Sequence, residues 1–335
     1  MEYRNLGRTG VKVSPLCLGC WNFGQVTDQD QTQAIIDRAF DAGVNFFDTA
    51  NSYGRGTSET MVGKALGGSG RRSRLVLATK VHFPMDDDDP NAQGNSRRHI
   101  IEQCEGSLRR LQTDYIDLYQ VHRPVTDVPL DETLRALDDL IRAGKVRYVG
   151  TSTFPAWQVV ESLWLSRELG LNRMVCDQPP YHLLDRRVER ELVPMALNFG
   201  IGIIPWAPLA GGFLTGRYAR GATPPVGSRF ERSVDAQRQR GLFTDAAFAV
   251  VDELTAIAND KGCTPGQLAL AWNMRQPGIT SPIVGPRTPE QWSEDLGAIK
   301  VTVTDADRER LDAVAPPGRA IATYYDAPWG PHEYR

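Results

Sequence analysis

Short apolar runs alternate along the chain with longer amphipathic segments. Near-continuous apolar runs predict buried strands over residues 14–20, 44–49, 75–81, 115–122, 146–152, 174–178, 201–207 and 281–285. Between them, apolar residues three and four positions apart predict helices, including those over 30–43, 96–111, 131–144 and 185–200. Ser96 is a suitable helix N-cap, and helices are expected to end at Gly43, Gly144 and Gly200.

Eight strands that alternate with helices predict parallel pairing and right-handed crossovers. Closing eight such units gives an α/β fold of the (β/α)8 (TIM) barrel type, so we expect a single domain over residues 1–335. Residues 3–16 predict a short hairpin that would cap the amino-terminal end of the barrel. The long loop over 208–243, after the seventh strand, is of a length typical of functional or mobile loops. The aromatic, proline-rich tail over 323–335 could fold over a pocket, pack at an interface or fray.

Polar side chains stand where the predicted strands end. Asp48 ends the second strand and Tyr53 follows it, while Lys80 ends the third strand and His122 the fourth. Chemistry in this fold takes place at the carboxyl ends of the strands, so these four side chains should converge. Singly, each has an ordinary explanation: a capping carboxylate, a loop aromatic, a solvated lysine or a turn histidine. Together they predict an acid/base group, because charged residues are rarely buried unpaired.

At these positions the sequence resembles the aldo-keto reductase family. The matching motifs, in order and reaching Ala298, are "FFDTANSYG", the lysine of "LATK", "LYQVHRP", "GTST", "PWAPLAGGFLTGR" and "IVGPRTPEQWSEDLGA". The resemblance implies a (β/α)8 fold, NADPH bound without a Rossmann domain, and the reversible reduction of aldehydes or ketones. The lack of a strand-associated GxGxxG agrees with this, because the usual fingerprint of a dinucleotide-binding Rossmann domain is then missing.

The resemblance implies that Tyr53 is the general acid, that Lys80 and Asp48 tune it, and that His122 orients the carbonyl. Negative charge grows on the carbonyl oxygen during hydride transfer, so a proton donor is needed there. A free tyrosine has a pKa of about 10, too high for ready exchange near neutrality. A nearby ammonium favours the phenolate, so we expect Lys80 to lower the pKa of Tyr53 and Asp48 to keep Lys80 charged.

The resemblance also implies a set of cofactor-binding residues at the later strands. Ser152 and Gln178 match groups that bind the nicotinamide carboxamide, and Trp206 stands where the family usually stacks a tyrosine on the ring. The following loop and the last strand would hold the pyrophosphate, the 2′-phosphate and the adenine through Ala207, Pro208, Leu209, Gly211, Arg217, Gly285, Arg287, Gln291 and Asp295. The expected cofactor is NADPH (NADP+). Asp295 replaces the asparagine common in the family, and a carboxylate is poorly placed beside a phosphate, so NADH stays a less favoured alternative.

Two further side chains are candidates for the substrate pocket. Trp21 follows the first strand and could equally pack in the core. His82, two residues after Lys80, could line the same mouth or simply cap the strand.

The four adjacent acids at 86–89 lack the spaced ligands and the turn glycine of a calcium loop, so we expect a solvated loop and no metal site.

Composition narrows the class of function. The chain is 41% hydrophobic and 24% charged with a formal net charge of −3, so no global positive field favours nucleic acid or an anionic membrane. No leader-like or membrane-spanning apolar run is visible, and we expect a cytoplasmic protein that acts on a small carbonyl compound; its oligomeric state stays open.

Five cysteines argue against a disulfide framework. Cys17 and Cys20 lie three apart on a predicted strand, so they should point to opposite faces as small buried hydrophobes.

Two other functions remain open on the sequence. One is a regulatory or sensor subunit that binds a nicotinamide dinucleotide with little turnover. The other is an aldolase that uses Lys80 as a Schiff base. That reaction needs an uncharged lysine, and a nearby Asp48 opposes it.

Overall fold

Within residues 1–231 and 241–322, which this computed structural model describes, eight parallel strands form the centre of the fold. In sheet order they are β10 (Ile283–Val284), β3 (Cys17–Gly19), β4 (Phe46–Asp48), β5 (Val76–Val81), β6 (Ile116–Val121), β7 (Val146–Ser152), β8 (Met174–Gln178) and β9 (Gly202–Ile203). The backbone N–H of Ile283 donates to the carbonyl of Pro205 at 2.8 Å, which joins the last strand of the sheet to the first. The predicted (β/α)8 barrel is therefore confirmed.

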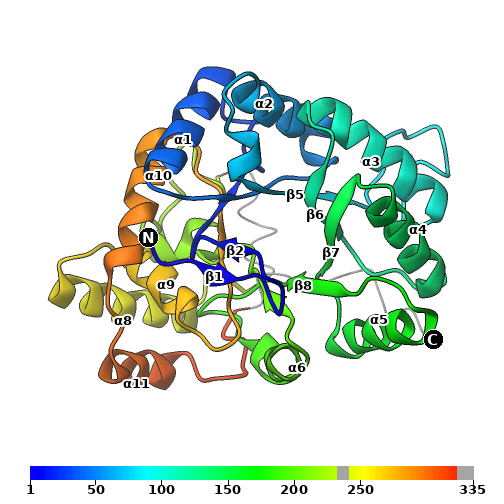
Figure 1. The fold of residues 1–335 in the computed structure, drawn as a ribbon. Helices are drawn as coiled ribbons and strands as arrows, with labels where there is room; N and C mark the ends of the chain where they lie inside the picture. Colours follow the sequence, from blue (N-terminus) through cyan, green and yellow to red (C-terminus); the bar gives the residue numbers. More distant parts are fainter. Residues whose placement is uncertain (232–240, 323–335) are drawn as a thin grey trace.

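Helices surround the strands (Figure 1). They are α1 (Gln29–Asp41), α2 (Thr57–Leu66), α3 (Arg97–Leu111), α4 (Leu130–Arg142), α5 (Ala156–Leu169), α6 (Leu192–Phe199), α8 (Asp245–Lys261), α9 (Pro265–Met274), α10 (Pro289–Leu296) and α11 (Asp305–Val314). The predicted cap of α3 is confirmed, because the Ser96 side chain accepts from the N–H of His99. Gly200 follows α6 with a φ of 67°, the left-handed conformation that glycine adopts without strain.

The predicted hairpin is also present. β1 (Arg4–Asn5) pairs antiparallel with β2 (Lys12–Val13), and in Figure 1 the pair lies across the centre of the ring of strands. Leu6 and Val13 are fully buried in a cluster with side chains of the barrel interior. Gly7 comes so close to the barrel that a Cβ there would lie 2.4 Å from the carbonyl oxygen of Val175. The hairpin thus seals the amino-terminal end of the barrel.

The strands separate two apolar clusters. The larger cluster lies between the sheet and the helices, and the smaller one fills the barrel interior beneath the hairpin. Cys17 belongs to the interior cluster and Cys20 to the outer one, and both are free, fully buried thiols. Their predicted placement on opposite faces of a strand is confirmed.

The helix predicted over 185–200 is wrong in its first half. The chain forms a short 3-10 turn at Arg187–Glu189, and α6 begins only at Leu192. Pro194 is the reason, because proline is tolerated in the first turn of a helix but clashes with the carbonyl four residues earlier when it lies further in. Asp185 instead holds the guanidinium of Arg187, at 2.8 and 2.6 Å.

The seventh and eighth predicted strands are reduced to two residues each. Only Gly202–Ile203 of the run 201–207 and Ile283–Val284 of the run 281–285 form regular ladders. Pro205 and Pro282 have no N–H to donate, and their carbonyls accept single bonds from Ile283 and Cys17 instead.

The long loop after β9 contains a 3-10 segment, η4 (Ala210–Thr215), and is described up to residue 231 and again from residue 241. Phe213, Tyr218, Phe230 and Phe243 pack against one another in it, with ring centroids 5.1 to 6.0 Å apart. The predicted aromatic tail, 323–335, lies outside the described residues. No helix in the described part of the chain is both long and apolar enough to cross a bilayer.

Candidate active site

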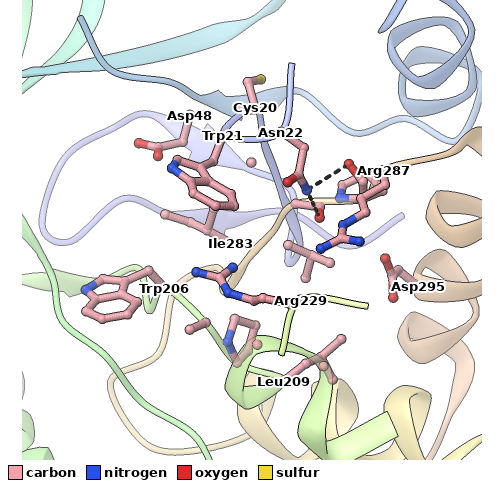
Figure 2. A pocket seen from close by; sticks show the side chains of 18 of the residues that line it. Cys20, Trp21, Asn22, Asp48, Trp206, Leu209, Arg229, Ile283, Arg287 and Asp295 are labelled. Atoms are coloured by element: carbon pink, nitrogen blue, oxygen red, sulfur yellow. Dashed lines mark hydrogen bonds between the residues drawn. The ribbon is translucent and has the colours of Figure 1, made fainter. Parts of the chain in front are cut away.

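A cavity of about 500 Å³ opens at the carboxyl ends of the strands. In Figure 2, Trp21 and Trp206 lie on one side of it and Arg287 and Asp295 on the other, with Arg229 between them. The predicted residues that line it are Trp21, Asp48, Tyr53, His122, Ser152, Gln178, Trp206, Ala207, Pro208, Leu209, Gly211, Arg217, Gly285, Arg287, Gln291 and Asp295.

The end of β4 carries both a carboxylate and a phenol to this cavity. Beyond Asp48, the N–H groups of Thr49 and Asn51 donate to carbonyls of β5, so the chain still follows the neighbouring strand. It then turns sharply in a 3-10 segment that begins at Tyr53, where Gly54 and Arg55 have φ angles of 56° and 50°. This turn holds the Tyr53 ring above the strand end from which Asp48 projects.

Lys80 links these two groups from beneath the cavity. Its side chain is 0% exposed, and its Nζ donates to Asp48, to the carbonyl of Thr49 at 2.8 Å and to the hydroxyl of Tyr53 at 3.2 Å. The second Asp48 oxygen accepts from the side-chain amides of Gln120 at 2.9 Å and Gln178 at 3.0 Å. The buried carboxylate and ammonium are therefore both paired and hydrogen-bonded.

The electrostatics of this group agree with one expectation and correct another. Burial alone would lower the pKa of Lys80, but Asp48 and then Tyr53 oppose it, and the pKa ends above its ordinary value. Lys80 is thus held as an ammonium, as expected. Burial raises the pKa of Tyr53 and outweighs the opposing effect of Lys80, so the net direction is upward, not downward. Tyr53 is a protonated phenol beside a fixed positive charge.

His122 completes the group. Its ring makes edge contacts with those of Tyr53, at a centroid distance of 5.8 Å, and Phe83, at 4.9 Å. Burial, together with the positive charges of Lys80 and Arg123, holds the pKa of His122 well below its usual value. The imidazole is therefore neutral at pH 7 and carries one N–H.

The later strands bring polar and aromatic groups to the same cavity. The Ser152 hydroxyl donates to the Gln178 carbonyl at 3.0 Å. The side-chain NH2 group of Gln178 donates to Asp48 and to Gln120. The side-chain oxygen of Gln178 is therefore the group that it can offer to a ligand amide. Trp206, at the end of the β9 run, presents a half-buried indole whose N–H donates to Thr153 at 3.4 Å.

Basic side chains gather at the far end of the cavity. Arg217 and Arg229 come from the long loop, and Arg287 follows β10 and donates to the carbonyl of Gly227 at 2.6 Å. The side-chain oxygen of Gln291 accepts from the backbone N–H of Arg287 at 2.9 Å. The contact between Arg287 and Gly227 holds the loop across the cavity, and the three guanidinium groups give this end a positive charge suited to phosphate groups.

Asp295 lies partly buried in the same wall. Burial and then the charge of Glu294 raise its pKa, Arg217 opposes them, and the pKa ends at about 8. At pH 7 the carboxyl group is therefore mainly neutral. In that state it offers a hydrogen-bond donor and an acceptor, as the side chain of asparagine does.

His82 is the predicted site residue that the structure places elsewhere. It is not among the residues that line the cavity, and its Nδ1 pairs with the side-chain oxygen of Asn95 at 3.0 Å. Phe83 lines the wall in its place. β5 ends at Val81 and the chain bends at Phe83, so the strand alternation that would keep His82 on the face of Lys80 no longer holds there.

The sequence did not single out several residues that build the cavity. Gln120 was recognisable in principle, because it lies two residues before His122 on the same face of β6. The Asn22 amide donates to the carbonyls of Gly285 and Pro286 at 2.7 and 3.3 Å, and Arg229 lies 4.6 Å from the Trp21 ring (Figure 2). Both contacts join segments far apart in the chain, so no local pattern marks them.

Acidic residues do not form a metal site in the described ranges. No group of three or more His, Cys, Asp or Glu side chains is arranged there to hold a metal ion. In the acidic loop over 86–89, Asp87 pairs with Arg55 at 2.5 Å and Asp89 with Arg98 at 3.2 Å.

Comparison with known proteins agrees with this geometry. The model of the aldo/keto reductase family matches residues 15–316. An uncharacterized oxidoreductase of Bacillus subtilis, YrpG, is 39% identical over 325 residues, which cover 94% of this chain and 96% of that protein. A probable voltage-gated potassium channel subunit beta of rice is 38% identical, with 94% and 96% covered, and a putative one of Schizosaccharomyces pombe is 39% identical, with 90% and 88% covered. The chain therefore belongs to the aldo/keto reductase family of oxidoreductases.

Proposed function

We propose that the protein is an NADPH-dependent reductase of aldehydes or ketones with Tyr53 as its general acid. One observation carries the proposal: the Tyr53 hydroxyl lies at the cavity wall, 3.2 Å from the ammonium of a lysine whose charge is held by a buried carboxylate. This is the arrangement needed to give a proton to an alkoxide as it forms and then to stabilise the phenolate left behind.

The roles of the residues follow from their protonation states. The dinucleotide, when bound, supplies a hydride to the carbonyl carbon. Tyr53 transfers its phenolic proton to the carbonyl oxygen, and the resulting phenolate is stabilised by Lys80. His122, neutral and with one N–H, donates a hydrogen bond to the same oxygen and so orients the carbonyl.

The cavity has the chemistry that a nicotinamide dinucleotide requires. The Trp206 indole offers a face for the nicotinamide ring, and Ser152 and Gln178 offer polar groups for its carboxamide. Arg217 and Arg287 offer permanent positive charges for the phosphates. Because Asp295 is mainly neutral at pH 7, it does not repel a 2′-phosphate, and this supports NADPH over NADH.

A second candidate is a regulatory subunit that binds the dinucleotide with little turnover. It is favoured by the relatives in rice, Arabidopsis thaliana and Schizosaccharomyces pombe that are named as voltage-gated potassium channel beta subunits. An aldolase is disfavoured, because Asp48 and Tyr53 keep Lys80 as an ammonium, which is not a nucleophile.

Steady-state oxidation of NADPH over a panel of aldehydes, ketones and sugars separates the two candidates. We expect turnover of at least one aldehyde, and a loss of about 10²- to 10⁴-fold in kcat for Tyr53→Phe with a nearly unchanged Kd for NADPH. Tyr148→Phe is the matched control, because this half-buried ring on β7 packs against the apolar cluster beneath the hairpin and does not line the cavity. Tight binding of NADPH without turnover of any substrate would favour the regulatory subunit.

A further inference from the structure

Gln120, on β6, is a fully buried amide beneath the cavity. Its side chain is 0% exposed, and it is not among the residues that line the cavity. Its NH2 group donates to Asp48 at 2.9 Å, and its side-chain oxygen accepts from the NH2 group of Gln178 at 3.0 Å. An amide engaged at both ends in this way acts on a ligand only through the residues that it holds.

The direction of each amide follows from the chemistry of Asp48. A carboxylate only accepts hydrogen bonds, so Gln120 and Gln178 must both turn their NH2 groups toward it. The side-chain oxygen of Gln120 then takes the second hydrogen of Gln178. Both hydrogens of the Gln178 amide are therefore used within the network, and its oxygen is the polar group that it keeps for a ligand in the cavity.

The contact between the two amides crosses a third strand. β7 lies between β6 and β8 in the sheet, and Gly150 of β7 is paired in register with Gln120. A Cβ at Gly150 would lie 3.5 Å from Cγ of Gln120 and 2.5 Å from Sγ of Cys176 on β8. Glycine at this position leaves the space through which the side chain of Gln120 reaches Gln178.

We propose that Gln120 is a positioning residue: it holds Gln178 so that the side-chain oxygen of Gln178 accepts a hydrogen bond from the carboxamide NH2 group of the nicotinamide. The inference rests on the proposed function, which places a nicotinamide dinucleotide in the cavity. An amide that is already held by two partners loses little conformational entropy when the ligand binds. Because Gln120 and Gln178 donate to the same oxygen of Asp48, the nicotinamide site and the proposed acid/base group share one network.

The test compares two dinucleotides that differ at the carboxamide. Reduced 3-acetylpyridine adenine dinucleotide phosphate carries a methyl ketone in place of the carboxamide of NADPH, so it has no N–H to donate to Gln178. Gln120→Met keeps the length of the side chain and removes its polar atoms. We expect this variant to raise the Kd for NADPH about 5- to 20-fold and the Kd for the analogue by less than about twofold. The KM for the carbonyl substrate should stay within about twofold, because Gln120 does not line the cavity.

Tyr119→Phe is the matched control on the same strand. Tyr119 packs in the outer apolar cluster and donates to the carbonyl of Ile100 at 3.2 Å, so the variant also removes a buried hydrogen bond of β6 but away from the cavity. Both Kd values should stay within about twofold of wild type. Fluorescence titration measures the Kd values, and urea unfolding checks that each variant is folded under the assay conditions.

Each outcome is decisive. Equal Kd values for the two dinucleotides in the wild-type protein would overturn the assignment without any need for a variant. Equal rises for both dinucleotides in Gln120→Met would also overturn it and make Gln120 a packing residue of the barrel interior. The expected pattern of binding without turnover of any carbonyl would uphold the role of Gln120 and remove only the proposed reductase activity.

Discussion

The two ends of the barrel interior differ sharply although the same strands build both. Four strands carry an apolar side chain and, two residues later on the same face, a polar one: Phe46 and Asp48, Ala78 and Lys80, Leu118 and Gln120, and Cys176 and Gln178. The first member of each pair belongs to the apolar cluster beneath the hairpin. The second belongs to the hydrogen-bonded network around Asp48 or Lys80.

The difference shows that the carboxyl-terminal end of the barrel interior is less favourable for stability than the amino-terminal end. Apolar packing at the amino-terminal end needs no charges, whereas the carboxyl-terminal end holds a fully buried ammonium and a carboxylate that is 2% exposed. Well-packed hydrophobic residues are often as stabilising as a buried ion pair or more so. The pair at Asp48 and Lys80 is therefore better explained by chemistry than by folding.

The largest expected effect comes from neutralising this pair. Asp48→Asn alone leaves a buried ammonium without its carboxylate and should lower the free energy of unfolding by about 3–5 kcal/mol. The double variant Asp48→Asn/Lys80→Met removes both charges and should recover most of that stability, while kcat stays at least about 10²-fold below wild type. Urea unfolding and NADPH oxidation measure the two quantities. A double variant that is as unstable as the single one, or fully active, would contradict the contrast between the two ends.

The next effect belongs to the amino-terminal end. Leu6→Ala removes a fully buried side chain of the hairpin and should lower the free energy of unfolding by about 2–5 kcal/mol. Because Leu6 lies in the apolar cluster and not at the cavity, kcat and the Kd for NADPH should stay within about twofold of wild type at a temperature where the variant is folded. A loss of activity comparable to that of the double variant would show that the two ends are coupled.

The sequence was sufficient to predict the barrel and the polar character of its carboxyl-terminal end. Alternating apolar runs and helices gave the barrel, and the polar residues that end each run gave Asp48, Lys80 and His122, because parallel strands bring their carboxyl ends together. Tyr53 was harder to place, since its position depends on a turn with two residues at positive φ, Gly54 and Arg55. A match to a family motif supplied it.

Other features depend on contacts that no local pattern contains. The network around Asp48 needs Gln120 and Gln178 from strands far apart in the chain. The upward shift of the Tyr53 pKa depends on how completely the ring is buried, and a charge-based argument from the sequence gave the opposite sign. The predicted helix over 185–200 failed because Pro194 restricts where α6 can begin.

A smaller effect is expected on cofactor preference, which depends on Arg287 at the carboxyl-terminal end. Arg287 lies at the end of the cavity proposed to hold the 2′-phosphate, so Arg287→Ala should raise the Kd for NADPH about 10- to 100-fold and that for NADH by less than about threefold. Arg38→Ala is a matched control, because Arg38 pairs with Glu290 on α10 outside the cavity, at 3.2 Å. Fluorescence titration measures both constants, and equal effects on the two dinucleotides would remove the 2′-phosphate assignment.

The smallest expected effect is a change with pH in the Kd for NADPH, caused by the ionisation of Asp295 at the carboxyl-terminal end. An ordinary aspartate, with a pKa near 3.8, is charged throughout the neutral range, whereas Asp295, with a pKa of about 8, is mainly neutral at pH 7 and loses its proton as the pH rises through 8. The new negative charge would face the phosphates of the dinucleotide, so the Kd for NADPH should rise about 3- to 10-fold between pH 7 and pH 9. Asp295→Asn cannot ionise and should bind NADPH equally well at both pH values. An identical pH dependence in the two proteins would mean that Asp295 is either already charged at pH 7 or too far from the phosphates to matter, and the neutral-carboxyl argument for NADPH would then fail.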